Sequence, residues 1–278
     1  MIVHPLIDSG ELSAALSSAR PPRVLDVRWK LGGPPGWGEY ERGHIPSAVY
    51  VDLDTELAGH GQPIDGRHPL PAIDDFRAAA RRWGINDSDA VVVYDDVSGM
   101  SAARAWWLLR HAGVADVRVL DGGLTSWVKS RGSLESGANI PEPGNVEVAF
   151  GALPTLDADE AAELAHTGVL LDARAGERFR GEVEPVDPRA GHIPGAVSVP
   201  TADNLDAEGR MLPASALAER FAALGVSSDT AVGVYCGSGV TAAHEALALE
   251  VAGLRAALYP GSWSAWSNDP ARPAATGA

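Results

Sequence analysis

The sequence predicts an α/β fold in which two similar halves each form a parallel sheet flanked by helices. Short β-branched runs alternate with alanine-rich stretches of helical spacing, and the order of motifs in the first half recurs in the second. The chain has 278 residues, of which 45% are apolar, so it is long enough for two ordinary domains. We therefore expect two homologous α/β domains in tandem.

The expected strands are uninterrupted apolar runs, as in strands that helices cover on both faces. They lie at residues 24–27, 90–94, 117–120, 169–172 and 231–235. Their alternation with helical stretches indicates parallel pairing, because a parallel connection needs a crossover helix. Each half is thus expected to be a sheet with helices on both sides.

The repeat also sets the expected domain boundaries. The segment YERGHIPSAVYVDLD of the first half corresponds to PRAGHIPGAVSVP in the second, and DGGLTSW corresponds to PGSWSAW. Residues 129–154 are rich in Gly, Ser and Pro and lack apolar periodicity, as in a linker crossing the surface. We place the domains at residues 1–128 and 155–278, with the boundary near Gly144, and expect the polar tail after Trp266 to be poorly ordered.

Charge and hydropathy exclude several kinds of partner. A net charge of −15 opposes binding to nucleic acid or to an anionic membrane surface. No stretch approaches the ~18 apolar residues of a membrane span, and the first residues lack a basic flank followed by an apolar core. We expect a cytoplasmic protein, in which any anionic substrate is held by locally clustered positive charge.

Cys236 is the only cysteine, which excludes an internal disulfide and a multi-thiolate metal site. We expect no metal and no cofactor. The thiol is then either a buried spectator or a nucleophile, and its surroundings favour the second reading. The run AVGVYCGSGVTAAHEALALEV predicts a strand ending at Tyr235, a tight loop, and a helix from about Thr241.

Gly237 and Gly239 let this loop turn with its N–H groups inward, and the following helix adds its positive end. Such a cradle favours the reactive thiolate. Sulfurtransferases and cysteine-dependent phosphatases both place a cysteine in such a loop. Phosphatases need an arginine at the end of the loop to clamp phosphate, and here Val240 and Thr241 follow, so phosphatase activity is disfavoured.

The motifs together resemble the tandem-domain rhodaneses, and within them the 3-mercaptopyruvate sulfurtransferases. The matching features are the two GHIP copies at 43–46 and 191–194, the Asp-x-Arg motifs at 26–28 and 172–174, and the closing DGGLTSW and PGSWSAW segments. The resemblance covers nearly the whole chain. It implies a catalytically inert N-terminal domain, with Asp95 at the position that Cys236 occupies in the second.

The loop sequence bears on the sulfur donor. Thiosulfate-using rhodaneses resemble CRKGVT, whereas the loop here, CGSGVT, is similar to that of the mercaptopyruvate enzymes. The resemblance implies that the donor contacts Gly237, Gly239, Val240 and Thr241. One departure is that Pro260 and Ala265 stand where relatives carry an aspartate and a glutamate. This leaves open any role of those carboxylates at the rim or toward acceptors, but the nucleophile does not depend on them.

The resemblance further implies a proton relay of Ser238, His68 and Asp54. It assigns the donor carboxylate to Arg178 and Arg189, and Arg180 is a spare candidate. The paired histidines and aspartates that recur in both halves are expected to be structural; they are His44, His192, Asp26 and Asp172.

These observations predict a sulfurtransferase that carries sulfur from 3-mercaptopyruvate as a Cys236 persulfide. The expected partners are a small anionic sulfur donor and either cyanide or a thiol acceptor, which is a small thiol or a thioredoxin-like protein. Two alternatives stay open. One is a thiosulfate sulfurtransferase, and the other is a non-catalytic sulfur-binding or interaction module.

Overall fold

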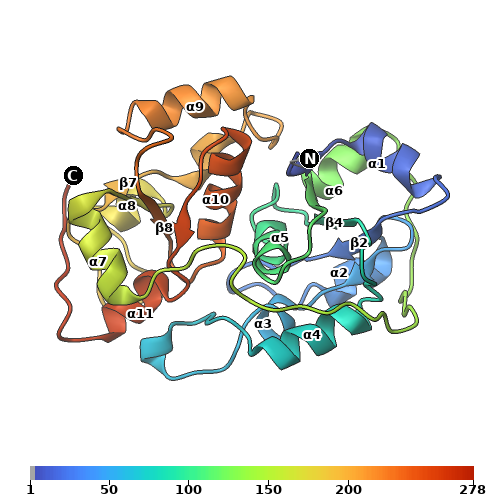
Figure 1. Cartoon of the computed structure of the whole chain (residues 1–278), viewed down its shortest axis with the longest axis horizontal. Helices are drawn as coiled ribbons and strands as arrows, with labels where there is room; N and C mark the ends of the chain where they lie inside the picture. The colour runs from blue at the N-terminus through green and yellow to red at the C-terminus, as the bar shows by residue number, and fades with distance from the viewer. Residues whose placement is uncertain (1–3) are drawn as a thin grey trace. The chain divides into compact units, whose positions relative to one another are not determined.

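The computed structural model describes residues 4–278, which divide into two compact units. The first unit holds residues 4–59, 71–153 and 208–210, and the second holds residues 60–70, 154–207 and 211–278. Each unit is built around its own parallel sheet (Figure 1). Compared with the sequence-based division, the main difference is that His60–Leu70 packs with the second unit.

The first unit contains a five-stranded parallel sheet in the order β1-β5-β4-β2-β3. Its strands are β1 Leu6–Ile7, β2 Arg23–Asp26, β3 Val49–Tyr50, β4 Val91–Tyr94 and β5 Val117–Leu120. Its helices are α1 Ser9–Leu16, α2 Trp37–Arg42, α3 Leu53–Glu56, α4 Ile73–Arg82, α5 Ala102–His111 and α6 Gly123–Lys129. Every residue of β4 is buried, as expected of a central strand covered on both faces.

Alternation along β4 assigns the helices of this unit to the two faces of the sheet. Val92 and Tyr94 share a core cluster with Leu12 of α1 and Trp127 of α6. The intervening valines of β4 are equally buried and point to the opposite face. Both faces of the central strand are therefore buried, and helices α1 and α6 cover one of them.

The second unit repeats this plan with a four-stranded parallel sheet in the order β7-β6-β8-β9. Its strands are β6 Val169–Asp172, β7 Val197–Ser198, β8 Val232–Tyr235 and β9 Ala257–Leu258. Its helices are η1 Pro63–Asp65, α7 Ala158–Thr167, α8 Gly176–Phe179, η2 Thr201–Asn204, α9 Ala214–Ala222, α10 Thr241–Val251 and α11 Ser262–Asn268. The predicted fold class, two α/β units with parallel sheets flanked by helices, is confirmed.

The stretch at residues 129–154 is not a loose crossing. Its backbone bonds to the first unit, where the Gly144 N–H donates to the Arg81 carbonyl at 2.8 Å. Val146 and Val148 are buried. Gly144 fits because a Cβ there would lie 1.9 Å from the Ile85 carbonyl oxygen. Val146 and Val148 are two positions apart, as are side chains on one face of an extended chain, and their burial holds this stretch against the first unit.

The polar tail is ordered, contrary to the expectation from its composition. Ala275 and His192 exchange backbone hydrogen bonds of 2.9 and 3.0 Å. The indole of Trp266 donates to the Pro273 carbonyl at 2.7 Å, and the Gly277 N–H donates to the Arg180 carbonyl at 3.0 Å. Backbone pairing, which composition does not report, ties down this segment.

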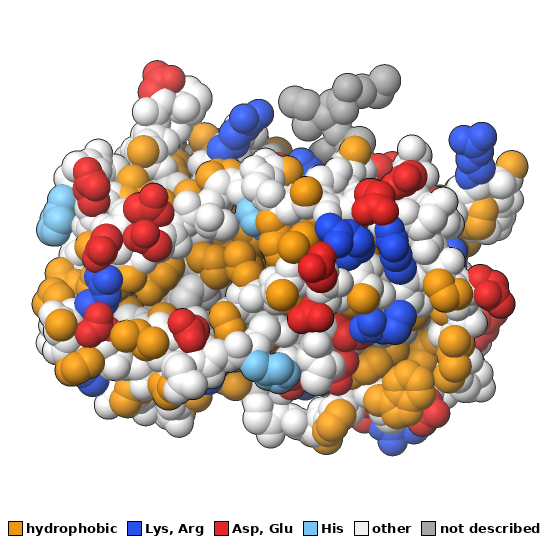
Figure 2. Space-filling view, turned by 60° about the horizontal axis from the view of Figure 1, so that its bottom comes forward, with side chains coloured by type: hydrophobic (Ala, Val, Ile, Leu, Met, Phe, Trp, Pro, Cys, Tyr) orange, Lys and Arg blue, Asp and Glu red, His pale blue; other side chains and the backbone are white. Residues whose placement is uncertain are grey.

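On the face drawn in Figure 2, acidic, basic and apolar side chains are interspersed. Within residues 4–278, no helix is both long enough and apolar enough to cross a membrane.

Candidate active site

Cys236 lies at the carboxyl end of β8, where the strand turns into α10. The strand is buried throughout, and the thiol is 1% exposed. Gly239 adopts φ +78°, which a side chain rarely allows, so the chain turns within four residues into the helix that begins at Thr241. A buried strand and a glycine turn therefore fix the position of the sulfur.

Backbone hydrogen bonds hold the loop and reach the sulfur itself. The Gly239 N–H donates to Sγ of Cys236 at 3.1 Å. The Cys236 N–H donates to Oγ of Ser262 at 3.1 Å, and the Trp263 N–H donates to the Cys236 carbonyl at 2.9 Å. The start of α11 therefore bonds to both backbone groups of the cysteine and holds the loop in place.

Gly237 serves a different purpose from Gly239. Its φ is not positive, but a Cβ at this position would lie 3.1 Å from Nη2 of Arg67 and 3.4 Å from Nη1 of Arg178. The absence of a side chain lets two guanidinium groups approach the residue next to the nucleophile. Val240, which is buried, and Thr241 complete the loop.

Ser238 and His68 are brought together, although they are 170 positions apart in sequence. Nδ1 of His68 shares a 2.7 Å hydrogen bond with Oγ of Ser238, and both side chains are buried. His68 belongs to His60–Leu70, which is part of the second unit. The Arg67 N–H donates to Oγ of Ser264 on α11 at 2.8 Å, so the same helix positions the loop and the histidine.

Asp54 lies on α3 of the first unit, where its carboxylate is exposed and accepts the indole N–H of Trp29 at 2.9 Å. Its assignment to the relay stays a prediction.

Two carboxylates organise the guanidinium groups beside Gly237. Nη2 of Arg178 contacts Glu184 at 2.7 Å and Asp187 at 3.2 Å, and Asp187 also pairs with Nη1 of Arg67. Burial raises the pKa of Asp187, although Arg67 and Arg178 oppose the rise. Burial pushes the pKa of Glu184 upward, but hydrogen bonds from Arg178 and from backbone N–H groups hold it below its ordinary value. Positive and negative charge are thus closely matched here.

Arg189, predicted to bind the donor carboxylate, is engaged elsewhere. Its guanidinium donates to the backbone carbonyls of Trp266, Ser267, Asp269 and Arg272 at 2.7–2.9 Å. These bonds fasten the end of α11 and the tail, and the assignment of Arg189 to the donor carboxylate stays a prediction. The spare candidate Arg180 forms an exposed ion pair with Glu182.

Arg67 was missed by the sequence analysis, although it directly precedes His68. The sequence offered one signal: if His68 lies in the site, the residues next to it in the chain must lie nearby. The pattern could not show that the chain around residue 67 folds onto α11, because that depends on tertiary packing.

The first unit has the same loop with an aspartate in place of the thiol. Asp95 is completely buried, and its carboxylate accepts four backbone N–H groups at 2.8–2.9 Å. The donors are Val97, Gly99, Ser101 and Ala102. The Leu124 N–H donates to the Asp95 carbonyl, as Trp263 does to Cys236. Four N–H groups thus contact the central side chain of the first loop, and one contacts that of the second.

The recurring histidines are structural. Nδ1 of His44 bonds to the Tyr40 carbonyl at 2.9 Å, and Nδ1 of His192 bonds to the Phe179 carbonyl at 2.8 Å.

The recurring aspartates each pair with the arginine two residues later. The Nη2–Oδ2 distance is 2.6 Å both in the Asp26–Arg28 pair and in the Asp172–Arg174 pair. These buried pairs support the loops after the first long strand of each unit.

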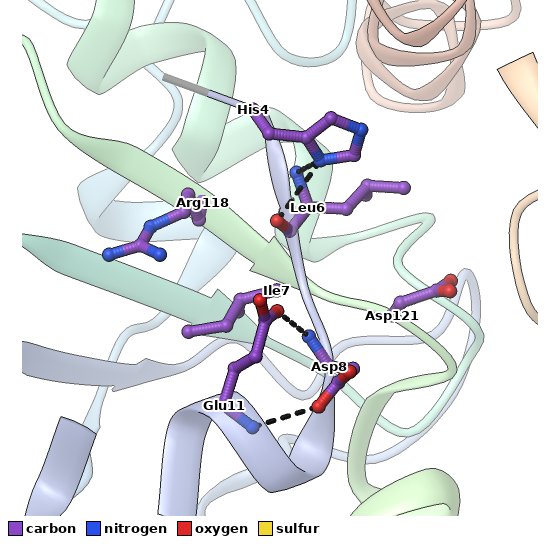
Figure 3. Close-up of a pocket in the computed structure, with 7 residues that line it drawn as sticks. All are labelled: His4, Leu6, Ile7, Asp8, Glu11, Arg118 and Asp121. Atoms are coloured by element: carbon purple, nitrogen blue, oxygen red, sulfur yellow. Dashed lines mark hydrogen bonds between the residues drawn. The ribbon is translucent and has the colours of Figure 1, made fainter. Parts of the chain in front are cut away.

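A separate pocket of about 330 Å³ lies on the first unit, where β1 meets α1 (Figure 3). It is lined by His4, Leu6, Ile7, Asp8, Glu11, Arg118 and Asp121. Asp8 and Glu11 are engaged in capping α1 through reciprocal side-chain bonds to each other's backbone N–H. None of the predicted site residues lines this pocket. Among the described residues, no group of three or more His, Cys, Asp or Glu side chains is arranged to hold a metal ion.

Comparisons with known proteins agree with this architecture. The rhodanese-like domain model matches residues 8–130 and 157–269, so the chain belongs to the rhodanese family and carries two such domains. A protein of Mycobacterium tuberculosis described as a putative thiosulfate sulfurtransferase, SseB, is 48% identical over 98% of this chain and 97% of its own. A probable 3-mercaptopyruvate sulfurtransferase of Pseudomonas aeruginosa is 45% identical over 98% of each chain.

Among solved structures, the 3-mercaptopyruvate sulfurtransferase SseA of Escherichia coli matches with a TM-score of 0.83 at 35% identity. The match covers 94% of this chain and 99% of that one. The relatives are thus sulfurtransferases by name, and their names differ in the sulfur donor.

Proposed function

We propose that this protein is a sulfurtransferase that takes sulfur from 3-mercaptopyruvate and passes it, through a persulfide on Cys236, to a thiol or to cyanide. The observation that carries the proposal is the convergence around one loop of a buried thiol, the Ser238–His68 pair and two guanidinium groups. A nucleophile, a proton carrier and an anion site are the three elements that this reaction needs.

In the first half-reaction, the Cys236 thiolate attacks the sulfur of the donor. The new S–S bond forms as the donor's C–S bond breaks, and the bonding pair leaves with pyruvate as its enolate. Ser238 and His68 deliver a proton to the enolate through their 2.7 Å hydrogen bond, and the family resemblance assigns Asp54 to the same relay. In the second half-reaction, an acceptor thiolate attacks the outer sulfur and releases the Cys236 thiolate.

The donor carboxylate is assigned to Arg178 and to Arg67, which border Gly237, and the family resemblance adds Arg189. Both guanidinium groups approach Gly237, so a carboxylate bound there holds the donor sulfur near Cys236. Loop contacts from Gly239, Val240 and Thr241 complete the donor site. Acceptors are proposed to be small thiols or a thioredoxin-like protein, in the cytoplasm, where reducing conditions keep a single thiol free.

Intact-mass measurement tests the proposal. The protein is incubated anaerobically with 3-mercaptopyruvate or with thiosulfate, and the mass should rise by one sulfur and return on addition of cyanide. Cys236→Ser should show no gain. If neither donor adds sulfur to the wild-type protein, the sulfurtransferase assignment fails, and the alternative of a non-catalytic module gains support.

Thiosulfate is the second candidate donor, because the relative with 48% identity is described by that activity. The loop argues against it as the preferred donor, since Gly237 and Ser238 add no charge to attract a doubly charged anion. Comparing kcat/KM for the two donors decides between them. We expect the higher value with 3-mercaptopyruvate.

A further inference from the structure

The guanidinium groups of the donor site belong to a continuous chain of ion pairs. Three arginines and three carboxylates contact one another, so their formal charges cancel. The members are Arg67, Arg174, Arg178, Asp172, Glu184 and Asp187. The carboxylate side chains are at most 4% exposed, so solvent screens them weakly.

Asp187 differs from the other two carboxylates in what it contacts. Asp172 pairs with Arg174, and Glu184 also accepts backbone N–H groups within its own loop. Asp187 alone among the three bridges Arg67 and Arg178, the two arginines that border Gly237. Its negative charge therefore acts where the donor's charge is expected to lie.

The two arginines keep binding capacity despite these ion pairs. Nε of Arg67 and Nε of Arg178 are buried and have no hydrogen-bond partner among the described residues. Buried donors without partners are costly unless a ligand satisfies them. The arginines at Gly237 thus keep unpaired N–H groups, while the chain of ion pairs carries no net formal charge.

We propose that Asp187 sets the donor preference, by cancelling one guanidinium charge so that a singly charged keto acid binds in preference to doubly charged thiosulfate. The inference rests on the proposed sulfurtransferase function. In a site without net charge, directed hydrogen bonds suffice to hold a carboxylate. A dianion has a larger desolvation penalty, and the site has no net positive charge to compensate for it. Each added positive charge attracts thiosulfate about twice as strongly as it attracts a singly charged donor.

Asp187→Asn and Arg67→Gln test this inference in opposite directions. The measured quantity is kcat/KM for thiosulfate divided by kcat/KM for 3-mercaptopyruvate, at pH 7 and fixed ionic strength. Asp187→Asn keeps the shape and one acceptor oxygen but adds a net positive charge, so the ratio should rise about tenfold, mainly through a lower KM for thiosulfate. Arg67→Gln should lower the ratio, and the double variant should return toward the wild-type value.

Glu182→Gln is the matched control, because it removes a negative charge from an exposed ion pair with Arg180 and should leave the ratio within about twofold. A ratio that is unchanged or lower in Asp187→Asn overturns the inference. If Asp187→Asn fails to fold or loses both activities, Arg67→Gln decides, and an unchanged ratio there overturns it as well. Sulfur transfer from neither donor by the wild-type protein would instead refute the proposed function.

Discussion

At the residue scale, Asp95 shows what the repeated loop is built to hold. Four backbone N–H groups converge on its buried carboxylate, and the corresponding loop of the second unit donates an N–H to the Cys236 sulfur. Burial raises the pKa of Asp95, while the backbone bonds oppose the rise. Because each carboxylate oxygen of Asp95 accepts two N–H groups, the hydrogen bonds favour a buried anion in the first unit, whereas the second unit has a reactive thiol at this position.

Replacing Asp95 by Asn tests how much this internal anion contributes to stability. The amide has nearly the same shape, but its NH₂ group faces N–H donors, so hydrogen bonds are lost and the free energy of unfolding should fall by about 2–4 kcal/mol. Urea denaturation followed by circular dichroism measures it. Asp96→Asn, which affects a partly exposed pair with Lys30, is the control and should cost under about 1 kcal/mol. Equal effects of the two substitutions would contradict the anion role of Asp95.

Ser238→Ala tests the proton path. The enolate of pyruvate needs a proton on departure, whereas sulfite leaves thiosulfate without one. Loss of the 2.7 Å bond to His68 should therefore lower kcat with 3-mercaptopyruvate by about 100-fold and affect thiosulfate much less. Steady-state kinetics with both donors measures the contrast. Ser267→Ala, at a buried serine whose hydroxyl donates to the Ser264 carbonyl in α11, should change neither rate by more than about twofold. A similar loss with both donors would assign Ser238 a structural role.

At the element scale, α10 carries a buried acid against η2. Glu245 is fully buried and accepts a 2.8 Å bond from Asn204, while its Oε1 has no hydrogen-bond partner among the described residues. Burial raises the pKa of Glu245 to about 7, although Thr201, Arg220 and Asn204 oppose the rise. The folded protein thus binds a proton that the unfolded chain has already released at the same pH.

This difference predicts that stability falls as pH rises. Between the ordinary glutamate pKa of about 4.5 and the folded value of about 7, the folded state holds more protons, so unfolding becomes progressively easier, by up to about 3 kcal/mol at pH 8. Glu245→Gln should flatten the dependence, whereas Glu219→Gln on the exposed side of α9 should not. Urea unfolding at pH 5, 6, 7 and 8 provides the comparison. A wild-type slope retained in Glu245→Gln would show that other groups cause it.

The sequence predicts the long elements well because they are determined locally. The observed β5 and β6 coincide with the expected ranges 117–120 and 169–172, and α10 begins at Thr241 as expected. The two-residue strands β1, β3, β7 and β9 were missed because pairs of residues carry no periodicity. Their pairing depends on neighbouring strands.

The site was less predictable than the sheets. Cys236, Ser238 and Gly239 lie in one loop, so the motif places them directly. Arg67 and Arg189 illustrate what the motif does not determine. Arg67 reaches the loop because its segment packs on α11, whereas the carbonyls at the end of α11 engage Arg189. Which arginine approaches the loop at Gly237 is decided by packing, and both arginines look alike in the sequence.

At the scale of the whole molecule, each unit includes a short segment from the other half of the sequence. Residues 60–70, from the first half, belong to the second unit, and residues 208–210, from the second half, belong to the first. The domain that holds Cys236 is therefore incomplete without part of the first half, including His68. A change in that segment should damage the second unit although it lies far away in sequence.

Gly66→Ala tests this dependence. Gly66 adopts φ +89° and ψ 170°, a conformation restricted to glycine, and a Cβ would lie 2.8 Å from the Gly261 carbonyl oxygen. The substitution should displace η1 from α11, lower the free energy of unfolding by about 3 kcal/mol, and reduce sulfur transfer at least tenfold by moving His68.

Gly113→Ala is the matched control, because Gly113 has φ +92° but nothing within 4 Å of the added Cβ. It should cost only about 1 kcal/mol and leave kcat unchanged. Urea denaturation and donor kinetics on the full chain measure both effects, and equal losses of activity in the two variants would show that residues 60–70 do not support the catalytic loop.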